Sequence, residues 1–392
     1  MHTYSELFAI REFRVVFAAS TATVAGQTMQ NLALSSLVFA ATGSPLLAAI
    51  AFLAGFLPSA VGAMALMSYA DRVRPRRYIV SLALLDAGAA AVLALADLPV
   101  WSMIAIVVAV GLVASIGSGV TGAMLNEVVG EDGFVLARSV LNITVGSMQI
   151  VGFAVGGAVI ATLGTRPALL VVCALGIVTA VVARAGLRNR PPRATGRGSL
   201  RLTAQGNRAL LGDRPRRSIL LAGWLPNGLI VGAEALYVPY AEEHAAVLFC
   251  AGAFGMLLGD VTMGRFVPAA KRFGLVVPLR LLLAVPYLVF FLEPSVWAGA
   301  IAVVLASFGF SASLALQERL LQLTPEDLRA QALGLGSSGM VTCQALGATL
   351  IGSLAQVLSP ALAMSLAAVL SIAVTLAIVP GLRRAAQATV VT

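Results

Sequence analysis

Long apolar runs bounded by short polar gaps make up most of the chain. A helix needs about 20 apolar residues to cross a hydrocarbon layer of about 30 Å, and a helix satisfies its backbone hydrogen bonds internally in lipid. Windows of about 19 residues therefore predict twelve membrane-spanning helices. These spans cover residues 15–40, 46–68, 78–96, 100–124, 138–163 and 167–186, then 219–240, 245–264, 274–292, 296–317, 332–357 and 361–380. The predicted fold class is all-α and integral to the membrane.

The gaps between the runs alternate between Arg-rich and Arg-free. The basic gaps hold Arg72, Arg74, Arg76 and Arg77; nine arginines from Arg188 to Arg217; and Arg265, Lys271, Arg272 and Arg280. The gaps around Gly43, Asp97, Glu242, Glu293 and Ser359 hold no Lys or Arg. Basic loops are retained on the cytoplasmic side during insertion. The pattern predicts a multi-pass protein of the cell membrane with both termini in the cytoplasm and 25 of its 26 basic residues there, Arg166 being the exception.

Composition excludes a soluble protein, since 59% of the 392 residues are apolar and only 11% are charged. The net charge of +9 arises beside the spans rather than along one folded face, which indicates topology and contact with anionic lipid rather than nucleic acid. The cysteines Cys173, Cys250 and Cys343 lie inside apolar runs without metal-ligand spacing. We expect them to pack as small residues, with no metal site.

An internal repeat predicts two related halves. A shift of 195 residues places Gly152 on Gly347 and Gly157 on Gly352, which equates the fifth span with the eleventh. The predicted organisation is a six-helix half over 1–186, an Arg-rich cytoplasmic linker over 187–217, and a six-helix half over 218–392. The linker holds Pro191 and Pro192, and its leucines leave open whether part of it forms a short interfacial helix or stays a plain disordered linker.

The gap after the second span resembles a motif of the major facilitator superfamily. That family carries a loop of the form G-x-x-x-D-R-x-G-R-R, and the sequence here reads Met67-Ser-Tyr-Ala-Asp71-Arg72-Val-Arg74-Pro75-Arg76-Arg77. The Asp-Arg pair and the trailing arginines match, whereas Met67 and Arg74 replace the two glycines. The resemblance extends over essentially the whole chain and implies twelve helices in two pseudo-symmetric halves. It also implies a cytoplasmic gate formed by Asp71, Arg72, Arg76 and Arg77; the alternative is that the arginines only set topology.

The fifth span carries Gly152-Phe153-Ala154-Val155-Gly156-Gly157, which is similar to the G-P-x-x-G-G element of antiporters in that family, with Phe153 in place of the proline. Together with the preceding acidic loop, it resembles the subgroup of drug, macrolide and siderophore exporters. Glycines at this spacing also let helices approach closely, so Gly152, Gly156 and Gly157 have a helix-packing role as the alternative.

Two carboxylates in predicted spans are candidates for proton coupling, because an ionisable group in the membrane is costly unless it faces a cavity or a partner. Glu234 shares a face of the seventh span with Asn227, and Tyr237 follows one turn later. The resemblance places this span along the central cavity. A carboxylate there is suited to carrying a proton or holding a cationic substrate, and a structural hydrogen-bonded Glu is the alternative. Asp86 in the third span is a second candidate, with packing equally open.

Other polar groups have a less direct interpretation. Gln27, Gln30 and Asn31 share one face of the first span, where they either line the substrate cavity or bond neighbouring helices. Asp260 lies one turn from Arg265, so we expect a local ion pair or a degenerate second gate there rather than proton transfer.

These observations predict a secondary active transporter that exports an amphipathic small molecule or antibiotic by proton antiport and alternating access. The expected partners are a small-molecule substrate and the lipid bilayer, the expected state is a monomer, and no cofactor beyond the proton gradient is expected. An importer or lysolipid flippase of the same fold stays open, as does a receptor or scaffold. We do not expect an enzyme, because His2 and His244 both lie outside the predicted spans. We do not expect ATP to drive transport directly, because no P-loop is present.

Overall fold

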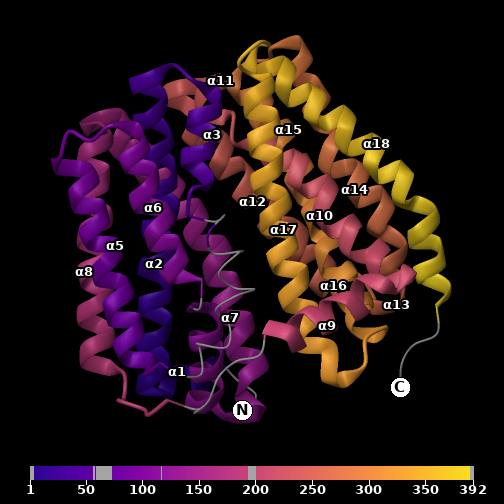
Figure 1. Ribbon diagram of the computed structural model, residues 1–392, viewed down its shortest axis with the longest axis horizontal. Coiled ribbons are helices and arrows are strands. Elements are labelled where there is room, and N and C mark those ends of the chain that lie inside the picture. Colours follow the sequence, from indigo (N-terminus) through magenta and orange to yellow (C-terminus); the bar gives the residue numbers. More distant parts are fainter. Residues whose placement is uncertain (1–3, 56–57, 59–72, 116, 193–199, 389–392) are drawn as a thin grey trace.

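The computed structural model describes residues 4–55, 58, 73–115, 117–192 and 200–388. Every regular element in these ranges is a helix. Figure 1 shows two groups of helices side by side, the indigo-to-magenta group from the first part of the chain and the pink-to-yellow group from the second. The all-α architecture predicted from hydropathy is therefore confirmed.

The first group begins with α1 (Tyr4–Ala9) and continues with α2 (Arg11–Thr42), α3 (Pro45–Leu53), α5 (Pro75–Leu95), α6 (Val100–Ala114), α7 (Gly117–Leu163) and α8 (Thr165–Gly186). Gly43 ends α2 in the left-handed conformation at φ 63°, and the Ser44 hydroxyl accepts a hydrogen bond from the Leu47 N–H at 3.2 Å to cap α3. Helix α7 contains two predicted spans, the end of the fourth and the fifth. Gly130 joins them with a φ of 72°, so a kink at one residue stands where the sequence predicts a loop.

The second group comprises α9 (Leu200–Gly212), α10 (Arg214–Glu234), α11 (Tyr237–Ala241), η1 (Glu242–His244), α12 (Ala245–Arg265), α13 (Ala269–Arg272), η2 (Phe273–Leu275), α14 (Val276–Ala284), η3 (Val285–Leu292), α15 (Val296–Phe308), η4 (Gly309–Ser311), α16 (Ala312–Gln322), α17 (Glu326–Leu354) and α18 (Pro360–Gln387). Three predicted spans of this group are therefore each divided. The seventh consists of α10 and α11, the ninth changes to a 3-10 helix at Val285, and the tenth changes at Gly309. By length and apolar character, seven helical segments within the described ranges can cross a membrane, and one of them, Arg214–Arg265, contains two predicted spans.

Each group has its own core, and the groups meet mainly along two helix pairs, with smaller contacts from α11 to α2 and α3 and from η1 to α7. Helices α2, α7 and α8 pack together in the first group, and α10, α17 and α18 in the second. Between the groups, α7 packs on α12 and α3 packs on α17. The exact boundaries of the halves, at 1–186 and 218–392, stay a prediction.

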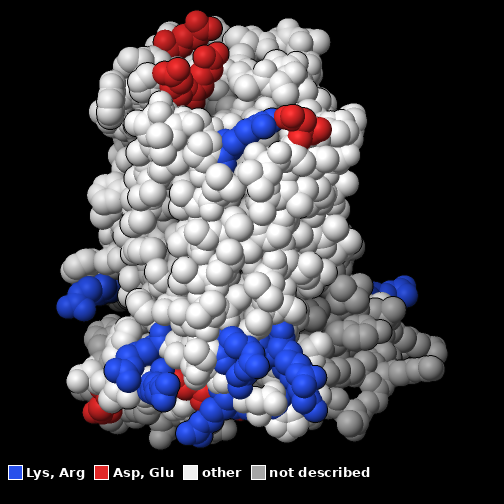
Figure 2. Space-filling model, turned by 90° about the vertical axis from the view of Figure 1, so that its left-hand side faces the viewer, with Lys and Arg blue, Asp and Glu red and all other residues white. Residues whose placement is uncertain are grey.

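Charge separates the two ends of the molecule. Figure 2 shows most Lys and Arg at one end of the visible face, with a few acidic side chains among them, and a cluster of Asp and Glu at the other end. We call these the Arg-rich end and the Arg-poor end. Arg166, the predicted exception, lies at the Arg-poor end and pairs with Asp97. Arg280 departs from the prediction: it is 0% exposed inside α14, so it is not part of the basic gap near residue 270. Which end faces the cytoplasm stays a prediction.

Part of the linker forms a helix rather than a plain disordered segment. Helix α9 packs on α17 and α10, its Leu210 is buried with Ile219 and Leu220, and the Gln331 Nε2 donates to the Asn207 Oδ1 at 2.9 Å. This helix is therefore fixed to the Arg-rich end of the second group.

The beginning of the linker is held by an ion cluster in the first group. Arg190 donates to both carboxylate oxygens of Glu12, at 2.5 and 2.8 Å, and its Nε lies 3.0 Å from an oxygen of Glu127. The Glu12 and Arg190 side chains are only 12% and 19% exposed. The hydrogen bonds from Arg190 lower the pKa of Glu12 against the opposing effect of burial.

Replacing Glu12 by Gln is expected to destabilise the protein by about 1–2 kcal/mol at pH 7, since a hydrogen bond to a charged group contributes about that much. A carboxyl whose pKa is lowered on folding contributes stability above its unfolded pKa of about 4.3. That contribution disappears as the pH falls through the lower folded value. Thermal unfolding in detergent at pH 7 and at stepwise lower pH measures the difference from wild type. Glu12→Gln and Arg190→Gln should be non-additive in the double variant; additive effects would contradict the pairing.

Candidate functional site

An aromatic layer crosses the boundary between the two groups. Phe249 of α12 stacks on Phe52 of α3, with ring centroids 4.8 Å apart and an interplanar angle of 18°. It also stacks on Phe153 of α7, at 4.6 Å and 15°. Tyr237 of α11 meets the same ring edge-on, with centroids 4.9 Å apart. Phe153, which replaces the proline of the antiporter element, thus joins one group to the other. These stacked rings close the space between the groups toward the Arg-poor end.

Two equivalent glycines close the same boundary. At Gly157 an added Cβ would overlap the Cβ of Ala246 in α12. At Gly352 it would lie 3.1 Å from the Leu46 Cα and 3.3 Å from the Ala49 Cβ in α3. These two glycines are the pair related by the shift of 195 residues. The repeat therefore places one close contact on each of the two main helix pairs between the groups, α7 with α12 and α3 with α17.

The other two glycines of the element face their own group. An added Cβ at Gly152 would lie 2.9 Å from both the Ala25 carbonyl oxygen and the Thr28 Cβ, and one at Gly156 would lie 3.0 Å from the Met29 Cγ. All of these partners belong to α2. The element predicted as one unit therefore has two roles, packing within the first group and contact between groups.

Glu234 lies at the end of α10, beside two tyrosines. The hydroxyls of Tyr237 and Tyr287 are 2.5 Å apart, and both phenols are within electrostatic range of the Glu234 carboxylate. Both tyrosines are buried, whereas Glu234, although deep in the protein, retains accessible surface. No hydrogen-bond partner of Glu234 occurs in the described ranges. Since only one hydroxyl of a pair can donate to the other, one tyrosine O–H is left free to donate to this carboxylate.

The remaining cavity candidates have different environments. Asn227 is 2% exposed, and its Nδ2 has no hydrogen-bond partner within the described part of the chain. In α2, Gln27 is exposed, Gln30 is buried and Asn31 is half-buried. Among these candidates in the described ranges, an interaction with Glu234 is found for Tyr237. A cavity-lining role for all five stays a prediction.

Asp86 belongs to a separate region. It is half-buried in α5, a helix that packs on α6, α7 and α8 of its own group. The two carboxylates proposed for protons therefore do not share one site.

The predicted gate lies partly outside the described residues. Asp71 and Arg72 are not described, Arg77 is exposed, and the Arg76 Nη2 donates to the Arg184 carbonyl oxygen at 2.5 Å within the first group. The equivalent loop of the second group is described: Arg272, which follows Arg77 by 195 residues, lies 3.4 Å from Glu318.

The expected ion pair between Asp260 and Arg265 is wrong. No ion pair joins them among the described residues, where Asp260 is half-buried and Arg265 is exposed. One helical turn places their Cα atoms close together, but the two side chains lie in different environments at the end of α12.

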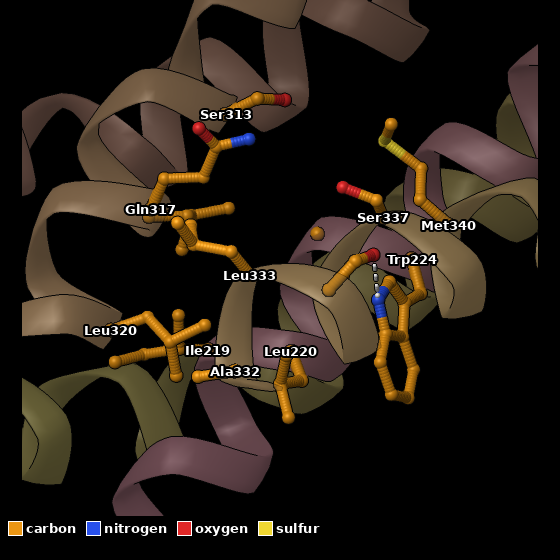
Figure 3. Close-up of a pocket in the computed structure, with 13 residues that line it drawn as sticks. Ile219, Leu220, Trp224, Ser313, Gln317, Leu320, Ala332, Leu333, Ser337 and Met340 are labelled. Atoms are coloured by element: carbon orange, nitrogen blue, oxygen red, sulfur yellow. Dashed lines mark hydrogen bonds between the residues drawn. The ribbon is translucent and has the colours of Figure 1, made fainter. Parts of the chain in front are cut away.

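A small pocket of about 50 Å³ opens within the second group. Ile219, Leu220 and Trp224 come from α10, Ser313, Gln317 and Leu320 from α16, and Ala332, Leu333, Ser337 and Met340 from α17. Figure 3 shows Ser313 and Gln317 on one side and Ser337 and Met340 on the other. The Trp224 Nε1 donates to the Gly336 carbonyl oxygen at 2.8 Å, which fixes the indole against the wall. This pocket combines an apolar lining with a few polar groups, as small-molecule sites commonly do.

Sequence reasoning missed Phe249, Tyr287 and Arg280. Phe249 and Tyr287 lie in uniformly apolar runs, where nothing in the pattern separates a ring at the boundary from a ring in lipid. Arg280 was predictable as a candidate site, because it lies inside the predicted span 274–292 and is an ionisable residue in an apolar run, as Glu234 is.

Comparison with known proteins supports the fold. The model of the Major Facilitator Superfamily matches residues 16–313. No curated protein matches the sequence. Among solved structures, a mutant of the nucleoside transporter NupG superposes with a TM-score of 0.76 at 12% identity, covering 94% of this chain and 99% of that one.

Two further solved structures show the same architecture. A POT family transporter in complex with 5-aminolevulinic acid gives a TM-score of 0.76 at 11% identity, covering 96% of both chains. A bacterial homologue of the human lysosomal transporter Spinster, inward-facing and unoccupied, gives 0.64 at 16% identity, covering 96% of this chain and 95% of that one. At these identities the likeness concerns the fold alone.

Proposed function

The chain belongs to the Major Facilitator Superfamily and is a membrane-embedded secondary transporter, and on this premise we propose that it exports an amphipathic small molecule, such as an antibiotic, in exchange for protons. The observation that carries the proposal is Glu234, a carboxylate that is deep in the protein, accessible and next to the closed boundary. A group in that position can exchange a proton with the substrate path and respond to the movement of the two groups.

The mechanism follows from the packing. In the arrangement described, Phe249 and the two interface glycines close the Arg-poor end. Opening that end requires α7 to part from α12 and α3 from α17, which would change the surroundings of Glu234, Tyr237 and Tyr287 together. Protonation of Glu234 in one arrangement and release in the other would couple proton movement to alternating access.

We also propose a latch and an orientation for the Arg-rich end. The latch at the Arg-rich end consists of Asp71, Arg72, Arg76 and Arg77. This end of the protein and both termini lie on the cytoplasmic side of the cell membrane. The protein acts as a monomer with the bilayer and its substrate as partners, and the proton gradient is its energy source. Arginine and carboxylate groups at a helix end are suited to forming ion pairs in one state and breaking them in another.

The test is a susceptibility panel of chemically diverse antibiotics, measured in cells with and without expression of the protein and repeated with a protonophore. We expect raised tolerance to at least one amphipathic compound and loss of that effect with the protonophore. Increased sensitivity on expression would indicate import and contradict the proposal. Tolerance that survives the protonophore would contradict proton coupling.

A further inference from the structure

Arg280 is a fully buried charge whose hydrogen-bonding groups are mostly unused. Its side chain is 0% exposed in α14. Its Nη2 donates to the Ser313 Oγ at 2.9 Å, while Nε and Nη1 have no partner in the described ranges. A guanidinium always carries its charge and offers five N–H donors. A single hydroxyl therefore leaves both the charge and most of the donors uncompensated.

No acidic residue among the described residues of the second group pairs with Arg280. Glu318 lies 3.4 Å from Arg272, and Glu234 is at the Arg-poor end of α10. Asp260 is half-buried in α12 and forms no ion pair in the described ranges. A charge inside a helix bundle is retained where it meets a partner or a cavity, so Arg280 has a charge and donors to offer to an anion that the described residues do not supply.

Ser313 connects Arg280 to the pocket. Its hydroxyl accepts the hydrogen bond from Arg280 and its side chain lines the pocket. No acceptor for the Ser313 hydroxyl proton occurs in the described part of the chain. A hydroxyl that accepts from a guanidinium is polarised as a donor. Ser313, which Figure 3 shows on the pocket wall, is thus a free donor whose oxygen is hydrogen-bonded to the Arg280 guanidinium.

We propose that this pocket binds the anionic group, a carboxylate or phosphate ester, of an amphipathic molecule. Ser313 donates to the anion, Arg280 compensates its charge, and Leu220, Leu316, Leu320 and Trp224 contact the apolar body. This inference rests on the proposed function in one respect: it assumes that the molecule bound in the pocket is the molecule that the protein transports. It narrows the substrate class from amphipathic compounds in general to amphipathic anions.

Equilibrium binding tests the charge preference. Trp101 and Trp297 are 69% and 68% exposed at the protein surface, so replacing both with Phe leaves Trp224 as the sole indole and a reporter of the pocket. The probes are 4-bromophenylacetate, its neutral amide and cationic 4-bromobenzylamine, whose bromine quenches indole fluorescence. We expect the anion to quench at a concentration at least about tenfold below the other two, as one compensated charge provides.

Variants assign that preference to Arg280. Arg280→Gln and Ser313→Ala should reduce the anion preference by about tenfold or more, whereas Ser313→Thr, which keeps the hydroxyl, should retain it. A preference that persists in Arg280→Gln, equal quenching by all three probes, or no quenching by the anion would each overturn the proposal. A free carboxylate and a phosphate ester are distinguished by repeating the titration with 4-bromophenyl phosphate.

The thermal stability of the ligand-free protein gives a second test. An unpaired buried charge destabilises a fold, and apolar replacements of similar volume are often neutral or stabilising. Arg280→Met should therefore unfold at the same temperature as wild type or higher, while losing anion binding. Lower stability or loss of folding in Arg280→Met would show a structural anchor and overturn the proposal. Neither test uses a proton gradient. If the protein prefers the anion but its expression changes no antibiotic tolerance, the result would contradict the proposed export and leave the anion site intact.

Discussion

Replacing Glu234 by Gln is expected to abolish proton-driven accumulation of substrate while leaving exchange of substrate across the membrane intact. Glutamine keeps the size and hydrogen-bonding groups of the side chain beside Tyr237 and Tyr287, but it cannot bind and release a proton. A pH difference of one unit corresponds to about 1.4 kcal/mol per proton, enough to maintain about a tenfold substrate gradient at one proton per molecule. Without coupling, the two sides reach equal concentrations.

The measurement uses proteoliposomes with an imposed pH gradient and a substrate identified from the panel. Net accumulation and substrate-for-substrate exchange are recorded for the same preparation. Glu243→Gln is the matched control, because Glu243 is exposed in the short 3-10 helix after α11. Accumulation that persists in Glu234→Gln would remove Glu234 from the coupling mechanism and direct attention to Asp86 in its separate region.

Adding one methyl group at Gly157 is expected to open the Arg-poor end. The Cβ of Gly157→Ala would overlap the Cβ of Ala246, and overpacking of this kind costs about 1–3 kcal/mol. A penalty applied only to the closed arrangement reduces its population relative to the open one by roughly 5- to 150-fold. Transport should slow, since alternating access needs both arrangements.

Cys250 reports the opening directly. Its Sγ lies 3.6 Å from the Ile150 carbonyl oxygen at the boundary between α7 and α12, so separating these helices exposes it to a water-soluble maleimide. With Cys173 and Cys343 replaced by Ser, labelling of Cys250 should increase in Gly157→Ala. Gly146→Ala is the matched control on the same helix, because its added Cβ would lie 3.6 Å from the Leu257 Cδ1, an ordinary contact.

A compensating substitution makes this prediction specific. Ala246→Gly removes the methyl group that the new Cβ would meet, so the double variant should recover both low labelling and transport. Failure of Ala246→Gly to rescue Gly157→Ala would show that the substitution acts through α7 itself rather than through the boundary between the groups.

Hydropathy was sufficient to predict the helices but not their interruptions. The runs are apolar on both sides of Ala235, Val285 and Gly309, and the change of helix type at these points depends on packing that no local pattern records. The acidic residues after Gly130 predicted a loop between the fourth and fifth spans. A glycine at positive φ reverses the chain in one residue instead, because it has no Cβ to clash.

The candidate site was predictable where a residue is unusual for its surroundings. Glu234 stands out in an apolar run, and the glycine element stands out by spacing and by its recurrence after 195 residues. The partners of these residues were not predictable. Ala246, Phe249 and Tyr287 are common residue types, and only the three-dimensional arrangement shows that they meet Gly157, Phe153 and Tyr237. Arg280 was assigned to the basic gap near residue 270 because other basic residues lie close to it in the sequence, although it is inside an apolar run.

The glycine contacts at Gly157 and Gly352 have a pharmacological consequence. They lie on two different helix pairs, yet both must form at once for the Arg-poor end to close. A compound that inserts into either seam by the thickness of a methyl group would hold both seams apart. An inhibitor that acts at one of these two contacts would therefore need no access to the substrate site. Resistance to it would require a change of shape at that contact that still lets the two groups pack together.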